Sequence, residues 1–226
     1  MTNHPSISIE RFAAIVPKSL ECESGKVFYS GRAAFSACSP LYILGANPGG
    51  DPTNYTTETV GNHTRHVLTQ LPDDWSAYRD EVWEGAAPGK HGMAPRVLHL
   101  FRHLRLEPGL VPASNLIFVR SRREEQLKAR KAALADLCWP FHAQVIDALR
   151  PRVILCLGNT AGKYVQRKLG ASLLIAQFIE QNDRHWKNQT YESPSGVRVV
   201  VATNPSVADW SASTTDPSEL VRDALG

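Results

Sequence analysis

Four short apolar runs divide the chain into segments. Each run is aliphatic or β-branched nearly throughout and is closed by turn-forming residues. Runs of this kind are typical of strands that are buried on both faces of a parallel sheet. We therefore predict four strands, at residues 41–44, 115–119, 153–158 and 197–202.

Amphipathic stretches lie between and after these runs. Their apolar residues recur at the spacing of one helix face, which predicts helices. The expected helices span residues 94–106, 124–149, 159–169 and 217–225, and Asp216 is placed to cap the last one. Pro140 removes a helix hydrogen bond, so we expect a break there and a second helix beginning near it.

The alternation of strands and helices predicts an α/β fold. We expect a three-layer α/β/α sandwich around a central, mostly parallel, four-stranded sheet. The 226 residues, 42% hydrophobic and 21% charged, suit a packed soluble domain. Without a repeat or a linker, residues 1–226 are interpreted as one domain. Residues 51–93 are polar and contain Gly and Pro, which predicts an insertion or lid, and residues 181–196 predict a polar loop or hairpin.

Charge and cysteine patterns narrow the expected location and partners. Glu10, Arg11 and Lys18 interrupt the N-terminal segment, so we expect neither a signal peptide nor a membrane anchor there. Four widely spaced cysteines predict reduced, buried thiols in a cytoplasmic protein and no metal cluster. The formal net charge of +3 permits a polyanionic partner without requiring one.

The polar residues that follow the strands are the candidate site, because ligands of open α/β sheets bind outside the carboxyl ends of the strands. These ends carry the sequences GANPGG at 45–50 and TNPS at 203–206, with Asn115 in or before the second predicted strand. No Ser-His-Asp triad, zinc motif or phosphate loop is visible. An amide exchanges no proton near neutrality, but it can orient a water molecule or read the edge of a planar base.

Two of these segments resemble the signature motifs of the uracil-DNA glycosylase superfamily, namely G-A-N-P-G at 45–49 and N-P-S at 204–206. The resemblance is nearest to the mismatch-specific and single-strand-selective branches and extends from about residue 41 to 211. It implies a monofunctional DNA glycosylase of base excision repair, which hydrolyses the N-glycosidic bond of uracil or of a related damaged or mismatched base. It also implies a reaction without metal or organic cofactor.

The resemblance assigns roles to three asparagines. Asn47 orients the water that attacks the sugar, Asn115 bonds the edge of the base, and Asn204 contacts the base or the backbone. Asn47 and Asn204 are therefore the catalytic candidates. Because Gly49 replaces a bulky residue that excludes the methyl group of thymine, a larger pyrimidine is expected to fit. The substrate-binding candidates are Gly45, Ala46, Pro48, Gly49, Tyr55, Asn115 and Ser206.

The chain departs from the family at two positions. No aromatic residue follows the first motif by about a dozen positions, so Tyr55 or a tryptophan from 51–93 would have to stack on the base. Ala208 is too small to fill a gap in a duplex, so either Val207 or Trp210 does so or the substrate is not a regular duplex. We expect single-stranded or damaged duplex DNA, because flipping a base costs least there. The DNA-binding candidates are Arg120, Arg122, Arg123, Val207 and Trp210.

Other interpretations stay open. Each asparagine is also an ordinary turn residue, and Ser206 an ordinary helix cap. The chain could be a non-catalytic nucleic-acid or nucleotide-binding protein on the same fold. A nucleoside hydrolase or transferase is disfavoured by the lack of a carboxylate near the motifs. His99 and His103 are interpreted as lining a helix flank. We expect a monomer.

Overall fold

The computed structural model describes residues 7–83 and 85–226; residues 1–6 and 84, which belong to the N-terminal segment and to the 51–93 excursion, lie outside the described residues. The strands are β1 (Leu41–Gly45), β2 (Ala113–Asn115), β3 (Val153–Leu157), β4 (Leu173–Ile179), β5 (Lys187–Glu192) and β6 (Arg198–Ala202). The α-helices are α1 (Ile9–Ala13), α2 (Val60–Thr69), α3 (Ala77–Asp80), α4 (Ala94–Leu104), α5 (Lys131–Leu149), α6 (Asn159–Leu169) and α7 (Ser218–Leu225). The 3-10 helices are η1 (Lys18–Leu20), η2 (Arg32–Phe35), η3 (Pro52–Asn54), η4 (Pro108–Leu110) and η5 (Glu124–Leu127).

One mixed sheet of six strands, in the order β2-β1-β3-β6-β5-β4, forms the centre of the fold. Strands β2, β1, β3 and β6 are parallel, whereas β5 is antiparallel to β6 and β4 is antiparallel to β5. The prediction of four strands was therefore wrong, because it missed the hairpin β4–β5, which extends the sheet beyond β6. The hairpin leaves a weak signal in the sequence, because β4 is an edge strand in which only Ala176 and Phe178 pack partly on the core, and β5 is polar.

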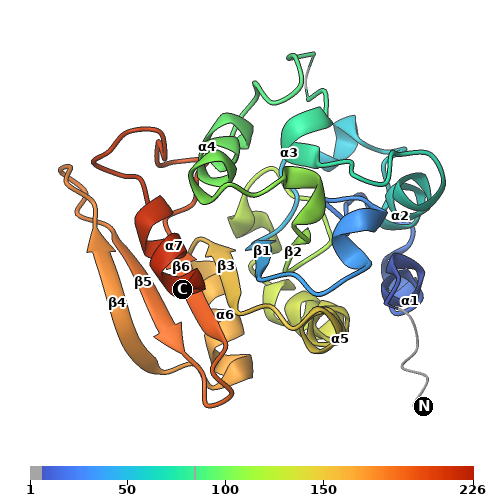
Figure 1. Ribbon diagram of the computed structural model, residues 1–226. Helices are drawn as coiled ribbons and strands as arrows, with labels where there is room; N and C mark the ends of the chain where they lie inside the picture. The colour runs from blue at the N-terminus through green and yellow to red at the C-terminus, as the bar shows by residue number, and fades with distance from the viewer. Residues whose placement is uncertain (1–6, 84) are drawn as a thin grey trace.

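Helices cover both faces of the sheet, as Figure 1 shows. Tyr42 of β1 and Ile154 of β3 share a core with α5 and α6. The alternate residues Ile43 and Leu155 pack with α4 and α7 instead. This alternation follows from the pleat, which sends successive side chains to opposite faces. The sheet has six strands instead of the predicted four, but helices on both of its faces agree with the predicted layers.

The helices α4 and α7 are joined by two histidine–carboxylate pairs. Nε2 of His99 lies 2.8 Å from Oδ2 of Asp216, and Nε2 of His103 lies 2.7 Å from Oε1 of Glu219. Asp216 also accepts a hydrogen bond from the Ser218 amide, but Pro217 and not the predicted Asp216 is the N-cap of α7. The two histidines thus lie on a helix flank, as predicted.

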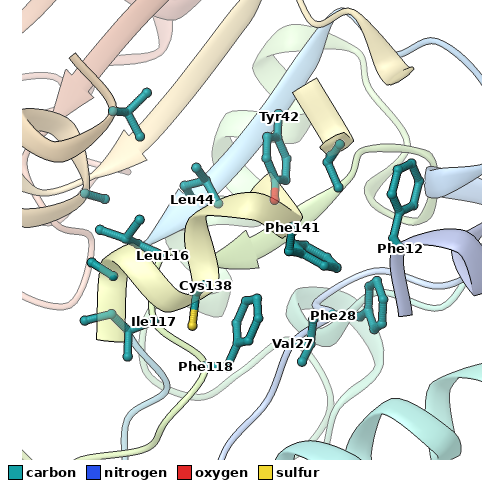
Figure 2. Packing of buried hydrophobic residues seen from close by; sticks show 14 of the residues in the cluster. Phe12, Val27, Phe28, Tyr42, Leu44, Leu116, Ile117, Phe118, Cys138 and Phe141 are labelled. Atoms are coloured by element: carbon teal, nitrogen blue, oxygen red, sulfur yellow. The ribbon is translucent and has the colours of Figure 1, made fainter. Parts of the chain in front are cut away.

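Helix α5 runs unbroken through Pro140, contrary to the predicted break. The proline ring is exposed, and the helix is held by its buried side: Phe141 packs edge-on against Phe118 at 5.2 Å between ring centroids. Figure 2 shows Cys138 and Phe141 facing Phe118 and Phe28 across this core. Packing of this extent can offset the roughly 3 kcal/mol that an interior proline costs a helix.

The strand predicted at 115–119 is displaced, since β2 ends at Asn115. Beyond it the chain stays buried but leaves the regular ladder. The excursion at 51–93 contains η3, α2 and α3. Thr59 caps α2 by accepting a hydrogen bond from the Asn62 amide over 3.2 Å.

Two cysteines correct the expectation of buried thiols. Cys138 and Cys156 are buried, but Cys22 and Cys38 are exposed, and all four are free. Among the described residues, no helix combines the length and the apolar character that crossing a membrane requires.

Candidate active site

The turn that follows β1 is fastened to the segment that follows β2. The amides of Leu116 and Ile117 donate to the carbonyls of Gly45 and Ala46, over 2.9 and 3.0 Å. Further along, the amide of Ser121 donates to the Pro48 carbonyl over 3.1 Å. These bonds continue the pairing of the two strands and hold the turn rigidly at the carboxyl end of the sheet.

Within this turn, the side chain of Asn47 has a fixed orientation. Its Nδ2 donates to Oγ of Ser121 and to the Pro48 carbonyl, both over 2.9 Å. Two acceptors on the nitrogen define which way the amide faces. Its Oδ1 accepts no hydrogen bond from the described residues, and the half-buried side chain can therefore accept one from a water molecule. Ser121, which the sequence did not suggest, is the residue that orients Asn47.

Asn204 has a more structural arrangement. Its Oδ1 accepts a hydrogen bond from the Ser206 amide over 2.8 Å, and its Nδ2 lies 3.4 Å from the Leu157 carbonyl. The first bond is an Asx turn, the ordinary turn interpretation of this motif. Arg96 of α4 donates to the Pro205 carbonyl and fastens the turn from the other side. In this conformation Asn204 shapes the second motif.

The two motifs meet at one pocket of about 280 Å³. Gly49 and Gly50 contribute from the first motif and Ser206 from the second. The remaining lining residues come from the N-terminal part of the chain and from the excursion; they are Tyr29, Ala77, Tyr78, Glu81, Trp83, His91, Gly92, Met93 and Ala94. Among the described residues that line it, none of the three candidate asparagines is found.

Asn115 lies behind the pocket wall. It ends β2 directly beside Gly45 and is 6% exposed. A Cβ atom on Gly45 would overlap Oδ1 of Asn115, so the glycine is what admits this side chain. Asn115 does not line the pocket itself, and its side chain instead packs against the first motif at Gly45.

Tyr55 and Trp83 stack on each other beside the first motif. Their ring centroids lie 5.1 Å apart with an interplanar angle of 19°. The guanidinium of Arg120 lies 4.2 Å from the centroid of Tyr55. Only Trp83 of this pair lines the pocket. The aromatic that could stack on a ligand is therefore Trp83, one of the tryptophans that the sequence left open, and Tyr55 supports it from behind.

Four charged side chains form a cluster behind the pocket, which we call the buried ion cluster: Lys26, Glu58, Glu81 and Arg120. Lys26 pairs with Glu81 and, over 3.3 Å, with Glu58. Arg120 pairs with Glu58 and donates to the Gly49 carbonyl. Charges can be buried in this way only when each has a partner. The sequence predicted none of this cluster apart from naming Arg120.

Three DNA-contact predictions are affected. Arg120 is 2% exposed and engaged in the buried ion cluster, so in this structure it cannot reach a phosphate. Trp210 is fully buried, with its Nε1 donating to the Thr203 carbonyl over 3.0 Å, and cannot serve as a wedge. Val207 is 53% exposed, and Arg122 and Arg123 are exposed at the surface beside the first motif.

The described residues contain no group of three or more His, Cys, Asp or Glu side chains that could hold a metal ion. No protein-family model matches the chain, and no curated protein matches it either.

Proposed function

We propose that this protein is a DNA base hydrolase, which cleaves the N-glycosidic bond of uracil or of a related damaged or mismatched base. The observation that carries the proposal is that Gly49 and Gly50 of the first motif line the same pocket as Ser206 of the second. The motifs lie 157 positions apart, counted from Gly49 to Ser206, and follow two parallel strands with β3 between them. The resemblance of both motifs to uracil-DNA glycosylases supports the same activity.

The Asn47 amide can orient a water molecule, but it cannot take a proton from it. Oδ1 of Asn47 can accept a hydrogen bond from water and aim it at the anomeric carbon, since Ser121 and Pro48 fix the nitrogen side of the amide. Holding water and sugar in a productive geometry supplies a large share of a hydrolytic rate enhancement. The amide does not deprotonate the water, so bond breaking has to run ahead of water attack.

The pocket suits a single flipped base. Trp83 provides an aromatic wall beside the Gly49–Gly50 turn, and Tyr29 and Tyr78 provide further ring surface. Stacking on aromatic side chains stabilises an extruded base by about 1–3 kcal/mol. We propose single-stranded or damaged duplex DNA as substrate, because Val207 is the one exposed wedge candidate and is small.

A second candidate is a non-catalytic nucleic-acid or nucleotide-binding protein. It is favoured by the Asx turn of Asn204 and by the burial of Trp210, which leave two predicted contacts unavailable.

One experiment separates the two candidates. End-labelled oligonucleotides that carry uracil, hypoxanthine or a mismatched base are incubated with the protein, and abasic sites are then cleaved with alkali. Cleavage at the modified position supports the hydrolase. Salt-sensitive binding without cleavage favours the binding protein and refutes the hydrolase.

A further inference from the structure

The pocket contains one carboxylate among its described lining residues, that of Glu81. The sequence did not single out Glu81, which reaches the pocket from the excursion at 51–93. No other described lining residue carries an acidic group, so this carboxylate is the strongest hydrogen-bond acceptor that a ligand would meet there.

Lys26 holds the side chain of Glu81 in place. The lysine is 1% exposed and donates to Oε1 of Glu81. The contact gives the buried ammonium the partner that it needs. Oε2 of Glu81 accepts no hydrogen bond from the described residues, and the side chain is 23% exposed. One oxygen is therefore bound to the protein, and the other is free to accept from a ligand.

Two tyrosines place hydroxyl donors near this acceptor. Burial and the Glu81 charge raise the pKa of Tyr29 and of Tyr78, so both stay protonated at physiological pH. Both tyrosines line the pocket, so the protonated hydroxyl of Tyr29 can donate to a ligand there.

We propose that Glu81 and Tyr29 are the specificity-determining pair of this pocket, and that they select a base with a lactam edge, a ring N–H next to a carbonyl. Glu81 accepts from the ring N–H, and Tyr29 donates to the carbonyl oxygen. Uracil and hypoxanthine present this edge. This inference rests on the proposed function, because it names the substrate class of the same site.

The same pair rejects the parent bases. Cytosine and adenine carry an unprotonated ring nitrogen where uracil and hypoxanthine carry the N–H. Its lone pair would face the Glu81 carboxylate, and neither group can donate. Sites built around a buried hydrogen bond discriminate strongly against ligands that leave it unmade. Deamination of a base would thus turn a repelled ligand into a bound one.

Binding of free nucleobases tests the inference without any glycosidic cleavage. The probes are uracil, cytosine and 3-methyluracil, each used as its 1-methyl derivative so that N1, which carries the sugar in DNA, has no hydrogen. The 3-methyluracil probe then lacks the remaining ring N–H as well. Their dissociation constants are measured by NMR titration of the full-length protein. We expect uracil to bind at least about tenfold more tightly than either of the others. Equal binding of uracil and 3-methyluracil, or no binding of uracil at millimolar concentration, would overturn the inference.

Variants identify the residues responsible. In Glu81→Gln the amide can donate to the ring nitrogen of cytosine, so the preference for uracil over cytosine should fall about tenfold. Glu58→Gln is the matched control, because Glu58 is the other carboxylate partner of Lys26 but does not line the pocket. This variant should keep the wild-type preference for uracil over cytosine. Retained preference in a folded Glu81→Gln protein overturns the assignment.

Tyr29→Phe keeps the inference testable if Glu81→Gln does not fold. It should weaken uracil binding about tenfold while uracil still binds more tightly than 3-methyluracil. Unchanged uracil affinity in this variant refutes the role of Tyr29. A wild-type protein that shows the base preference but releases no base from DNA supports the pocket assignment and refutes the proposed hydrolase.

Discussion

The side-chain amide of Asn47 donates a hydrogen bond to the hydroxyl of Ser121 over 2.9 Å, although 74 positions separate the two residues. Ser121 is 4% exposed, and its own amide is bound to the Pro48 carbonyl. The serine is therefore held on the turn that it supports. In the proposed reaction it is a positioning residue, which acts on water through Asn47.

Ser121→Ala should slow base release about tenfold, because the Asn47 amide loses one of the two bonds that orient it. The loss should lie in kcat, with KM for the oligonucleotide unchanged, and Ser121→Thr, which keeps the hydroxyl, should restore most of the rate. Single-turnover and steady-state kinetics on one uracil-containing oligonucleotide provide both numbers. An equal loss in the alanine and threonine variants would point to packing instead of orientation.

Gly50 is predicted to be essential to the turn for steric reasons. Its φ is +97°, and an added Cβ would lie 2.9 Å from Cε2 of Tyr55. We expect Gly50→Ala to lower the free energy of unfolding by about 1–3 kcal/mol. The neighbouring Gly49 has open space at the Cβ position, so Gly49→Ala should change it by less than about 0.5 kcal/mol. Urea denaturation of both variants provides the comparison, and equal losses would contradict the turn geometry.

Substitutions of Arg120 and of Arg122 should have different effects: the first should lower stability, and the second should weaken DNA binding. Arg120→Met leaves Glu58 without its guanidinium partner and should cost about 3 kcal/mol of unfolding free energy. Arg122→Met removes an exposed charge near Asp51, so it should leave stability unchanged but weaken DNA binding and reduce the salt slope by about one. Denaturation and fluorescence anisotropy at several salt concentrations measure both effects. If the Arg120 variant were stable but defective only in DNA binding, the buried ion cluster would be misassigned.

The sequence predicted the parts of the site that local pattern determines. Apolar runs located β1, β3 and β6, and the parallel arrangement then placed both motifs at one edge of the sheet. Tyr29 and Lys26 were missed because their segment joins the site through isolated antiparallel bridges, such as Phe28 to Ser114, which leave little periodicity. Glu81 was missed because its role depends on a partner 55 positions away.

Burial of polar-looking segments was equally hard to predict. Trp210 lies in a polar stretch that predicts an exposed loop. In the structure it is buried on the face of the sheet that α4 and α7 cover, and its Nε1 donates to the Thr203 carbonyl. Arg120 belongs to a basic run of a kind that is usually solvated. Its burial follows from two acceptors, Glu58 and Gly49, that come from distant parts of the chain.

His142 should make stability depend on pH. Burial lowers its pKa to about 4, and the neutral ring is bonded to Tyr42 over 2.8 Å and to the Leu116 carbonyl over 3.2 Å. The unfolded chain, with a pKa near 6.5, binds more protons between these values, so stability is complete above pH 6.5 and declines toward pH 4. From pH 7 to pH 5 this group should remove about 2 kcal/mol.

The His142 contribution is the difference between the wild type and a His142 variant in the unfolding free energy that each loses from pH 7 to pH 5. Urea denaturation at pH 7 and pH 5 should show a smaller decline in His142→Gln than in the wild type, by about 2 kcal/mol. His66→Gln, which removes an exposed histidine, should decline as the wild type does. A His142→Gln decline that equals the wild-type one would mean that His142 titrates normally in the folded protein.

The most direct test of the proposed hydrolase is the single-turnover release of uracil from single-stranded DNA by the wild type and by Asn47→Ala. Asn54→Ala, an exposed amide in η3 beyond the same turn, is the control. We predict base release by the wild type and the control, and a loss of about 100-fold or more in Asn47→Ala with DNA affinity within about threefold. Release by Asn47→Ala at the wild-type rate, or none by the wild type, would contradict the proposed mechanism.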